Sequence, residues 1–221
     1  MALEEHIKIY ISDELLTNAL GQRICPICLI LQNKTNELLC KLQFEEVHNQ
    51  GVNTLVLSAG GYCHFHFWYL EKLGSPVTNA QFLEDLLKKV EKEFMEDTSG
   101  DTADWFGDET HCPVCSSCKE WEEKLLISFT GKIAEKDFSA RYESSRGLCL
   151  PHLSKALKKL SDKEQRIFLA KSSRCQLDLL IQELRLVVAK WQNTDHSPGG
   201  ERDSAYRAIG KLVGGKYYRA G

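Results

Sequence analysis

Two short cysteine motifs, each present twice and in the same order, constrain this chain more than any other feature. The first motif is Cys25-Pro26-Ile27-Cys28, and it recurs as Cys112-Pro113-Val114-Cys115. The second is Gly61-Tyr62-Cys63-His64-Phe65-His66, and it recurs as Gly147-Leu148-Cys149-Leu150-Pro151-His152. From the first cysteine of one motif to the cysteine of the next is 38 positions in one copy and 37 in the other. Because type, order and spacing all match, the sequence predicts an internal duplication.

Both motifs have the spacing of metal ligands. A Cys-x-x-Cys pair and a Cys-x-x-His pair together make the Cys3His set of tetrahedral zinc sites. Proline after the first cysteine suits the first turn of a helix, and that end of a helix favours thiolate over thiol. Gly61 and Gly147 stand where a positive φ would turn the chain into the next helix. The predicted ligands are Cys25, Cys28, Cys63, His66, Cys112, Cys115, Cys149 and His152.

Each copy holds a complete set of four ligands, so we expect the ligands to pair within each copy. The sequence leaves two possibilities for the identity of the metal. Zinc, at two ions per chain, is favoured by the Cys3His set and the compact gaps. The alternative is a pair of [4Fe–4S] clusters, usually held by four cysteines although histidine replaces cysteine in some centres. A thioredoxin-like redox pair is disfavoured, since it belongs in a βαβ context that this sequence lacks.

Three cysteines, Cys40, Cys118 and Cys175, have no counterpart in the other copy, and we expect them to be buried as small apolar side chains. Cys118 follows Cys115 by three residues, so it could instead supplement or replace a ligand. His64 corresponds to Leu150 in the second copy, which favours His66 as the ligand.

Apolar periodicity predicts an all-α fold of two tandem helical repeats, each with a metal cassette that joins helix N-termini. The expected parts are an N-terminal helical segment (1–24), repeat 1 (25–96), an acidic linker (97–111), repeat 2 (112–192), and a linker with a C-terminal helix (193–221). Strand character is weak everywhere and is best at Asn53 to Leu57. The apolar stripe of the last helix of repeat 2 is expected to comprise Ile167, Phe168, Cys175, Leu179, Leu180, Leu184 and Val187.

The composition is that of a soluble globular protein, with 43% hydrophobic and 27% charged residues in 221. A net charge of −3 gives no general attraction for nucleic acid or anionic membrane. No stretch approaches the roughly 18 apolar residues of a membrane span, and the first six residues carry two acids where a secretory signal is basic. We therefore expect a cytoplasmic protein, in which nine cysteines do not form a disulfide framework.

The two pairs of motifs, together with the run from Glu201 to Gly214, resemble an uncharacterised prokaryotic family, domain of unknown function 6062. The resemblance spans most of the chain. It implies a helical, metal-binding protein and brings no established activity or catalytic residue.

Three functions are compatible with the sequence. The favoured one is a metal-binding scaffold or interaction protein with an unidentified protein partner. Its partner surface would be the final helix, through Tyr206, Ile209, Leu212 and Tyr217, unless that helix packs back on the domain. The alternative is electron transfer or redox sensing at the same ligands. Catalysis is disfavoured, because each cassette offers four closed ligands and no catalytic motif is recognised.

Overall fold

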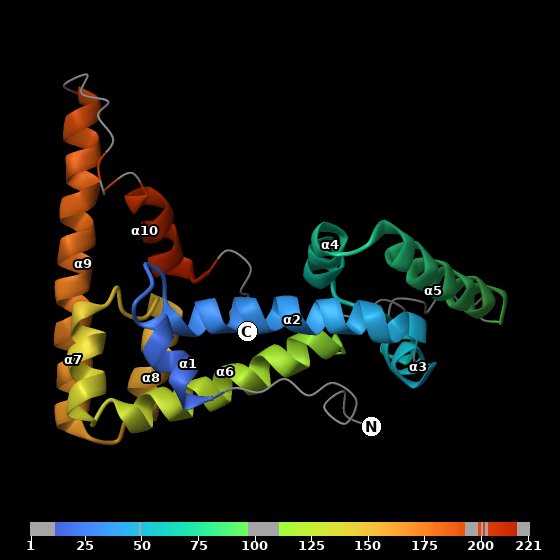
Figure 1. The fold of residues 1–221 in the computed structure, drawn as a ribbon, viewed down its shortest axis with the longest axis horizontal. Helices are drawn as coiled ribbons and strands as arrows, with labels where there is room; N and C mark the ends of the chain where they lie inside the picture. Colours follow the sequence, from blue (N-terminus) through green and yellow to red (C-terminus); the bar gives the residue numbers. More distant parts are fainter. Residues whose placement is uncertain are drawn as a thin grey trace. The chain divides into compact units, whose positions relative to one another are not determined.

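The structure is a computed structural model that describes residues 12–48, 50–96, 111–192, 199, 201 and 203–215. Within these ranges the chain forms helices and short connections and contains no strand (Figure 1), so the predicted all-α class is confirmed. The helices are α1 (Asp13–Ala19), α2 (Pro26–His48), α3 (Gln50–Ser58), α4 (His64–Leu73), α5 (Pro76–Glu96), α6 (Pro113–Lys132), α7 (Lys136–Ser144), α8 (Leu150–Lys159), α9 (Lys163–Gln192) and α10 (Ser204–Val213). None of them is both long enough and apolar enough to cross a bilayer.

Each of the four motifs marks the start of a helix. The first cysteine of a motif directly precedes the helix, and its carbonyl oxygen accepts a hydrogen bond from the amide four residues on. The backbone N–H groups donate to the cysteine carbonyl oxygens as follows: Leu29 to Cys25 (3.0 Å), Phe67 to Cys63 (3.0 Å), Ser116 to Cys112 (3.1 Å) and Leu153 to Cys149 (2.8 Å). Pro26 and Pro113 are the first residues of α2 and α6, where the missing N–H is not needed. The second ligand of each motif therefore lies in the first helical turn.

The glycine turns ahead of α4 and α8 have the predicted conformation. Gly61 has φ of 84° and Gly147 has φ of 70°, in the left-handed region that residues with a Cβ rarely adopt. Both glycines redirect the chain into the helix that carries the Cys-x-x-His motif.

Helix order repeats along the chain in the way that the motifs do. Helices α2 to α5 have 23, 9, 10 and 21 residues, and α6 to α9 have 20, 9, 10 and 30. The tandem repeat itself stays a prediction from the sequence.

The chain divides into two compact units that differ from the expected repeats. Unit 1 contains Asn33–Trp121, and unit 2 contains Ile11–Gln32 and Glu122–Gly221. The boundaries fall inside α2 and α6, so each of these helices contributes residues to both units. The acidic linker lies almost wholly outside the described residues, as do 193–198 of the second linker and Met1 to Ile11 of the N-terminal segment.

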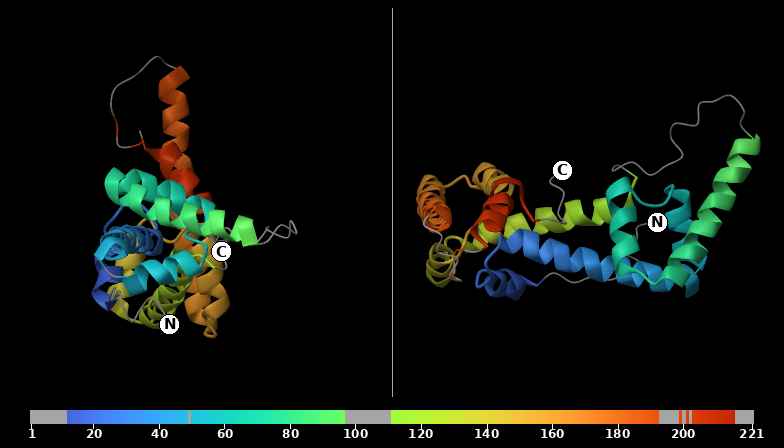
Figure 2. Two further views of the ribbon diagram at one scale, coloured as in Figure 1. Left: turned by 90° about the vertical axis from the view of Figure 1, so that its right-hand side faces the viewer. Right: turned by 90° about the horizontal axis from the view of Figure 1, so that it is seen from above.

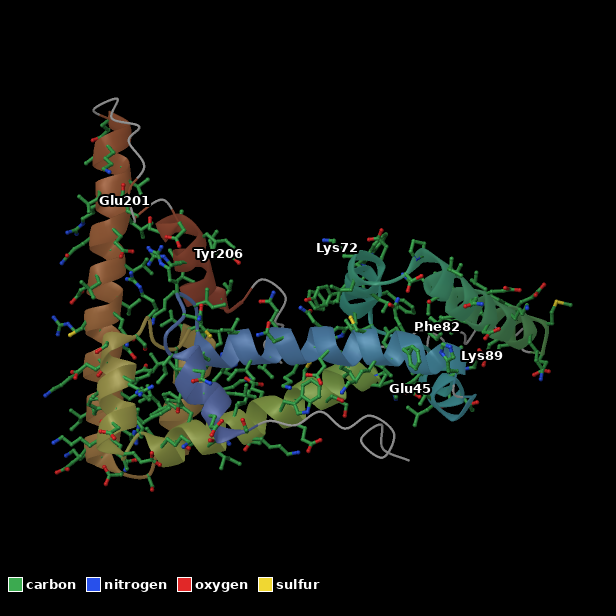
Figure 3. All side chains as sticks on the ribbon, viewed as in Figure 1. Glu45, Lys72, Phe82, Lys89, Glu201 and Tyr206 are labelled. Carbon is green, nitrogen blue, oxygen red and sulfur yellow. The ribbon has the colours of Figure 1, made fainter. Side chains whose placement is uncertain are left out.

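Unit 1 has its core where α5 packs against α3 and α4 (Figure 2). Asn53 to Leu57, the segment with the most strand character in the sequence, is part of α3, in line with the predicted all-α fold. Val52 and Val56 lie one helical turn apart, so they share a face, and both are buried. On α5, Phe82 meets the ring of Tyr62 at a centroid distance of 5.6 Å, and Lys89 donates to the Leu57 carbonyl oxygen at 2.6 Å (Figure 3). Packing, rather than strand propensity, therefore fixes α3.

Unit 2 buries a face of α9 that matches the expected stripe only in part: Leu180 is buried, and Phe168, Leu184 and Val187 are half-buried. The buried residues of this helix are Leu169, Ser172, Ser173, Gln176 and Leu180. Cys175, Ile167 and Leu179 are exposed. The cause is a polar contact with α7: the Tyr142 hydroxyl lies 3.3 Å from the Ser173 hydroxyl, and Gln176 donates to the Tyr142 carbonyl oxygen at 3.0 Å. Apolar periodicity alone does not predict the buried face of a helix when that face contains hydrogen-bonded polar groups.

The final helix also buries its polar side. Helix α10 packs on α8 and α9, with Ser204, Arg207 and Lys211 buried, while Tyr206, Ile209 and Leu212 are more than half exposed. The helix thus packs back on its unit and still presents an apolar surface. Tyr217, the fourth residue of the expected partner surface, lies outside the described residues.

Candidate metal centres

The eight predicted ligands come together in two groups of four. Site A, in unit 2, comprises Cys25, Cys28, Cys149 and His152. Site B, in unit 1, comprises Cys63, His66, Cys112 and Cys115. Within each group the ligand atoms all lie within 4.8 Å of one another. Each group could therefore hold a metal ion.

The expected pairing within each copy is wrong. Each site takes its Cys-Pro-x-Cys pair from one copy and its Cys-x-x-His pair from the other. The physical reason is the length of the helices. Helix α2 has 23 residues, which makes it about 34 Å long at 1.5 Å per residue. Helix α3 has nine residues and is about 13 Å long, too short to return Cys63 to Cys25.

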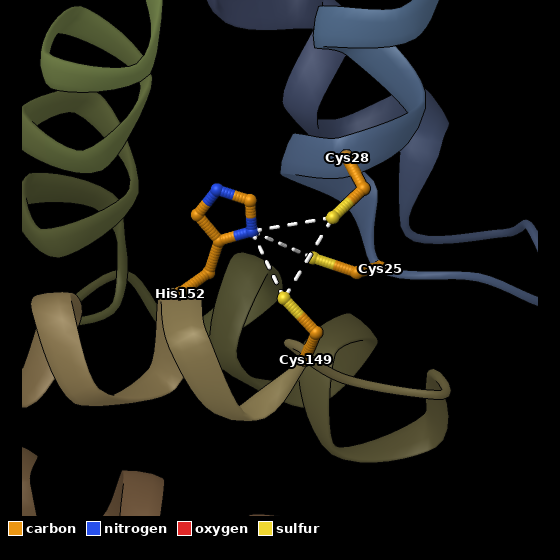
Figure 4. A group of neighbouring side chains, drawn as sticks. All are labelled: Cys25, Cys28, Cys149 and His152. Atoms are coloured by element: carbon orange, nitrogen blue, oxygen red, sulfur yellow. Dashed lines mark hydrogen bonds between the residues drawn. The ribbon is translucent and has the colours of Figure 1, made fainter. Parts of the chain in front are cut away.

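In site A the start of α2 faces the start of α8 (Figure 4). The Nδ1 atom of His152 lies 3.0 Å from the sulfur of Cys149, 3.3 Å from that of Cys28 and 3.5 Å from that of Cys25. The sulfurs of Cys28 and Cys149 are 3.7 Å apart. The backbone amide of Gly215, just past α10, donates to the Cys28 sulfur at 3.2 Å. That N–H stabilises a thiolate at this position.

In site B the start of α6 faces the start of α4. The Nδ1 atom of His66 lies 3.3 Å from the Cys63 sulfur, 3.4 Å from that of Cys115 and 3.5 Å from that of Cys112. The sulfurs of Cys63 and Cys115 are 3.6 Å apart. Both sites therefore present Nδ1 and three sulfurs at nearly the same separations.

A buried glutamate supports the histidine of site A. Glu122, on α6, is only 7% exposed, and its Oε1 lies 3.1 Å from Nε2 of His152. Lys155 donates to both Glu122 oxygens, at 2.8 and 3.0 Å. A carboxylate on the outer nitrogen of a ligating histidine fixes the ring and its tautomer, leaving Nδ1 for the metal.

The sequence reading missed Glu122, although a signal was present. Glu122 precedes the buried Leu125, Leu126 and Phe129 by three, four and seven positions, so it occupies the buried face of α6. An acid in the middle of an apolar stripe calls for a partner, because a buried charge is costly unless it is paired.

Site B differs from site A at this position. Thr35, on α2, stands where the second copy has Glu122, at the same offset of 87 as the Cys-Pro-x-Cys pairs. Its hydroxyl lies 3.2 Å from the sulfur of Cys118, and the interaction of Cys118 with His66 helps to raise the pKa of that imidazole. Cys118 is partly exposed, which corrects the expected burial, and it lies beside the four ligands of site B without belonging to them.

The other candidate residues lie away from both groups. Cys40 and Cys175 are exposed, so the expectation of buried apolar cysteines is wrong for them as well. Both lie on outward faces of long helices, where local apolar spacing does not reveal which side meets the core. His64 is exposed and accepts a hydrogen bond from the Trp68 indole at 3.1 Å, outside site B.

The ligands strongly perturb one another's protonation. Burial alone would lower the pKa of His152, but hydrogen bonds with Cys149, Cys25 and Glu122 raise it to about 11. Burial alone would likewise lower the pKa of His66, and hydrogen bonds with Cys112, Cys118 and Cys63 raise it to about 11. Contacts with neighbouring sulfurs lower the pKa of Cys63 and raise that of Cys115. Without an ion, each group thus pairs a thiolate with an imidazolium, and a cation would displace these protons.

Comparison with known proteins identifies a family for this chain but assigns it no activity. No curated protein and no solved structure has a significant match to the chain. A family profile does match, over residues 4–219, and its description is "Family of unknown function (DUF6062)". The match covers almost the whole sequence, including every ligand of both sites and α10. The chain therefore belongs to this family of unknown function.

Proposed function

We propose that the protein is a zinc-binding helical scaffold in which two structural zinc ions, one in each site, tie helix N-termini together. The observation that carries the proposal is the spacing of the ligand atoms. A tetrahedral zinc ion with Zn–S near 2.3 Å and Zn–N near 2.05 Å sets its sulfurs about 3.8 Å apart and sulfur and nitrogen about 3.6 Å apart. The observed separation is 3.7 Å between the sulfurs of Cys28 and Cys149 and 3.6 Å between those of Cys63 and Cys115. Sulfur and nitrogen lie 3.0 to 3.5 Å apart, and all ligand atoms of a site lie within 4.8 Å of one another. These values suit one small ion at the centre of each group.

The same separations speak against the alternative of iron–sulfur clusters. In a [4Fe–4S] cluster each protein ligand binds a different iron atom, so the ligand sulfurs lie on opposite sides of a cluster core. Sulfurs 3.6 or 3.7 Å apart are in van der Waals contact and leave no room for such a core. This geometry supports zinc over the cluster.

A structural role is supported by closure and burial. Each group supplies four protein ligands, whereas catalytic zinc keeps one position for water or substrate. His152 is fully buried, and the other ligands of both sites are at most 9% exposed. Zinc at these positions would contribute its binding free energy directly to folding.

Metal analysis tests the proposal. The protein is purified anaerobically without added metal, and zinc, iron and acid-labile sulfide are measured per chain alongside a visible spectrum. We expect about two zinc ions per chain, negligible iron, and no absorption near 400 nm. Iron and sulfide in equal amounts, with broad absorption in that region, would replace the scaffold by an electron-transfer or redox function. A stably folded chain without either metal would overturn the proposal altogether.

A helical protein partner is the second part of this proposal. On the C-terminal half of α9, Ile181, Val188 and Ala189 line a shallow groove with Leu184 and Arg185. Their spacing of three, four and seven residues resembles the seam by which one helix receives another. Ile181 and Val188 are exposed in the described structure. We expect Val188→Glu to abolish a complex formed by the wild-type chain, while Lys171→Glu, on an exposed position of α9, leaves it intact.

A further inference from the structure

A cavity of about 700 Å³ lies beside site A, within unit 2. One part of its wall consists of three metal-ligand residues of site A, Cys25, Cys28 and Cys149. Another part is α10, which contributes residues from both its buried and its exposed sides. The volume is that of pockets that bind small organic molecules.

The cavity has a cationic side. Arg207 and Lys211, one turn apart on α10, both line it and are only 6% and 7% exposed. Arg23 and Arg146 line it as well. Four cationic side chains therefore surround one small volume.

Acidic groups balance only part of this charge. Glu183 accepts from Arg207 and from Arg146, the latter at 3.0 Å, and Asp203 accepts from Arg207 at 2.9 Å and lies 3.2 Å from Arg23. Lys211 instead donates to the Arg146 carbonyl oxygen at 3.0 Å. Within the described part of the chain Lys211 forms no ion pair. Three thiolates around a zinc ion would add one negative charge, so among these described groups four cations stand against three negative charges, and Lys211 is the cation that has no acidic partner.

Other lining residues of the cavity are apolar or aromatic, namely Ile24, Leu180, Tyr206, Ile209 and Val213. Tyr206 projects from the outer side of α10 (Figure 3) and is more than half exposed, as are Ile209 and Val213. Gly210 also lines the cavity, and a Cβ placed on it would meet no atom within 4 Å. The lining of the cavity thus combines exposed apolar side chains of α10 with the buried cations Arg207 and Lys211.

We propose that this cavity binds a small organic monoanion, an alkyl or aryl carboxylate, beside the metal of site A. The carboxylate would take the place at Lys211 and Arg207, where it supplies the missing negative charge. The apolar body would lie along Tyr206, Ile209 and Val213, removing their surface from water. The inference rests on the proposed function only for the charge of the metal site, since the cavity and its basic residues are part of the fold.

Displacement of a fluorescent probe tests the proposal on the full chain as purified. The probe is 8-anilinonaphthalene-1-sulfonate, an aryl monoanion, and the competitors are octanoate and 1-octanol, which share the apolar chain and differ in charge. We expect saturable binding of one probe per chain, displaced by octanoate at concentrations at least tenfold lower than by 1-octanol. Equal displacement by the two competitors, or no saturable binding, would overturn the proposal.

Two variants test whether the probe and octanoate bind in this cavity. Lys211→Met removes the charged amine and keeps an unbranched side chain one atom shorter, and we expect at least a tenfold loss of affinity for octanoate. Lys158→Met, at an exposed lysine of α8 away from the cavity, is the matched control and should change affinity less than twofold. Gly210→Phe should block the probe by filling the cavity. Unchanged octanoate affinity in both Lys211→Met and Gly210→Phe would show that the anion binds elsewhere.

Zinc is counted in the same samples. A chain that lacks zinc and still binds octanoate more tightly than 1-octanol would overturn the zinc scaffold and support the anion site. A chain with two zinc ions that binds both competitors equally would support the zinc scaffold and overturn the anion site.

Discussion

The sulfurs of Cys28 and Cys149 lie 3.7 Å apart, although the two residues are 121 positions apart in the sequence. Cys28 belongs to the first copy of the motifs and Cys149 to the second. Site B also combines ligands of both copies, because the sulfur of Cys63, from the first copy, lies 3.6 Å from that of Cys115, from the second. A metal in either site therefore closes a long loop of chain, and neither copy can complete a site by itself.

Paired substitutions distinguish this exchange from pairing within a copy. Cys28→Ser with Cys149→Ser removes two ligands of site A only, so we expect one zinc ion per chain to remain. Cys28→Ser with Cys63→Ser removes a ligand from each site, and we expect both ions to be lost or greatly weakened. Zinc is measured after gel filtration in the presence of a weak chelator. Cys40→Ser, at an exposed cysteine of α2, is the control and should keep two ions; the reverse pattern in the paired variants would restore pairing within a copy.

Glu122 should tune site A without affecting site B. Glu122→Gln replaces the carboxylate that lies 3.1 Å from His152, and loss of such an outer partner typically costs about 10- to 100-fold in metal affinity. Zinc affinity is measured by competition with a chromophoric chelator, where one of the two sites should weaken. Glu123→Gln is the matched control, because Glu123 is exposed and pairs with Lys159 on the surface. Equal effects of the two substitutions would remove Glu122 from the metal site.

Gly147→Ala should destabilise unit 2 and weaken site A. The alanine would have to adopt φ of 70°, and its Cβ would lie 1.7 Å from the Gln176 side-chain oxygen. Left-handed strain in a non-glycine residue costs on the order of 1–3 kcal/mol, and thermal unfolding of the zinc-loaded chain measures the loss. Gly131→Ala, in α6 with no atom within 4 Å of the new Cβ, should instead raise the stability by up to about 1 kcal/mol. A neutral Gly147→Ala would mean that the turn into α8 tolerates another backbone path.

Zinc affinity should rise with pH. In the metal-free chain the pKa of His152 is about 11, so the imidazole still carries its proton at pH 6 to 8 and zinc must displace it. Contacts with Cys149 and Cys25 also raise the pKa of Cys28, which adds a thiol proton to the displaced set. The deprotonated form is the one that binds, so affinity should increase about tenfold per pH unit for each proton displaced. A flat affinity profile over this range would contradict the ligand assignment.

Removal of the metal should destabilise both units. Site A joins the start of α2 to the start of α8, and site B joins the start of α6 to the start of α4. Structural zinc supplies on the order of 10 kcal/mol in small domains, as much as the whole stability of many of them. We expect a strong chelator to lower the melting temperature and zinc, but not magnesium, to restore it. Unchanged melting after complete removal of zinc would show that the helices hold together through packing alone.

Local signals in the sequence account for much of the structure. The prolines after Cys25 and Cys112 and the glycines before the other two motifs specify helix starts and turns, because their effect on φ acts within a few residues. The identities of the eight ligand residues follow from motif spacing for the same reason. Local signals are weak at α3 and misplace part of the buried face of α9. At α3 the β-branched Val52 and Val56 are buried in a helix, and at α9 the buried face includes polar residues, of which Ser173 meets Tyr142.

By itself, then, the sequence determined the all-α class, the helix starts, the positive-φ glycines and the eight residues that gather in two Cys3His groups. Only the tertiary structure decided which pairs share a site, that Glu122 supports His152, and that α10 buries Arg207 and Lys211 beside a cavity. The physical reason is the range of the interactions. Backbone conformation and motif spacing depend on neighbours along the chain, whereas ligand pairing and burial depend on where helices of 20 to 30 residues bring distant segments together.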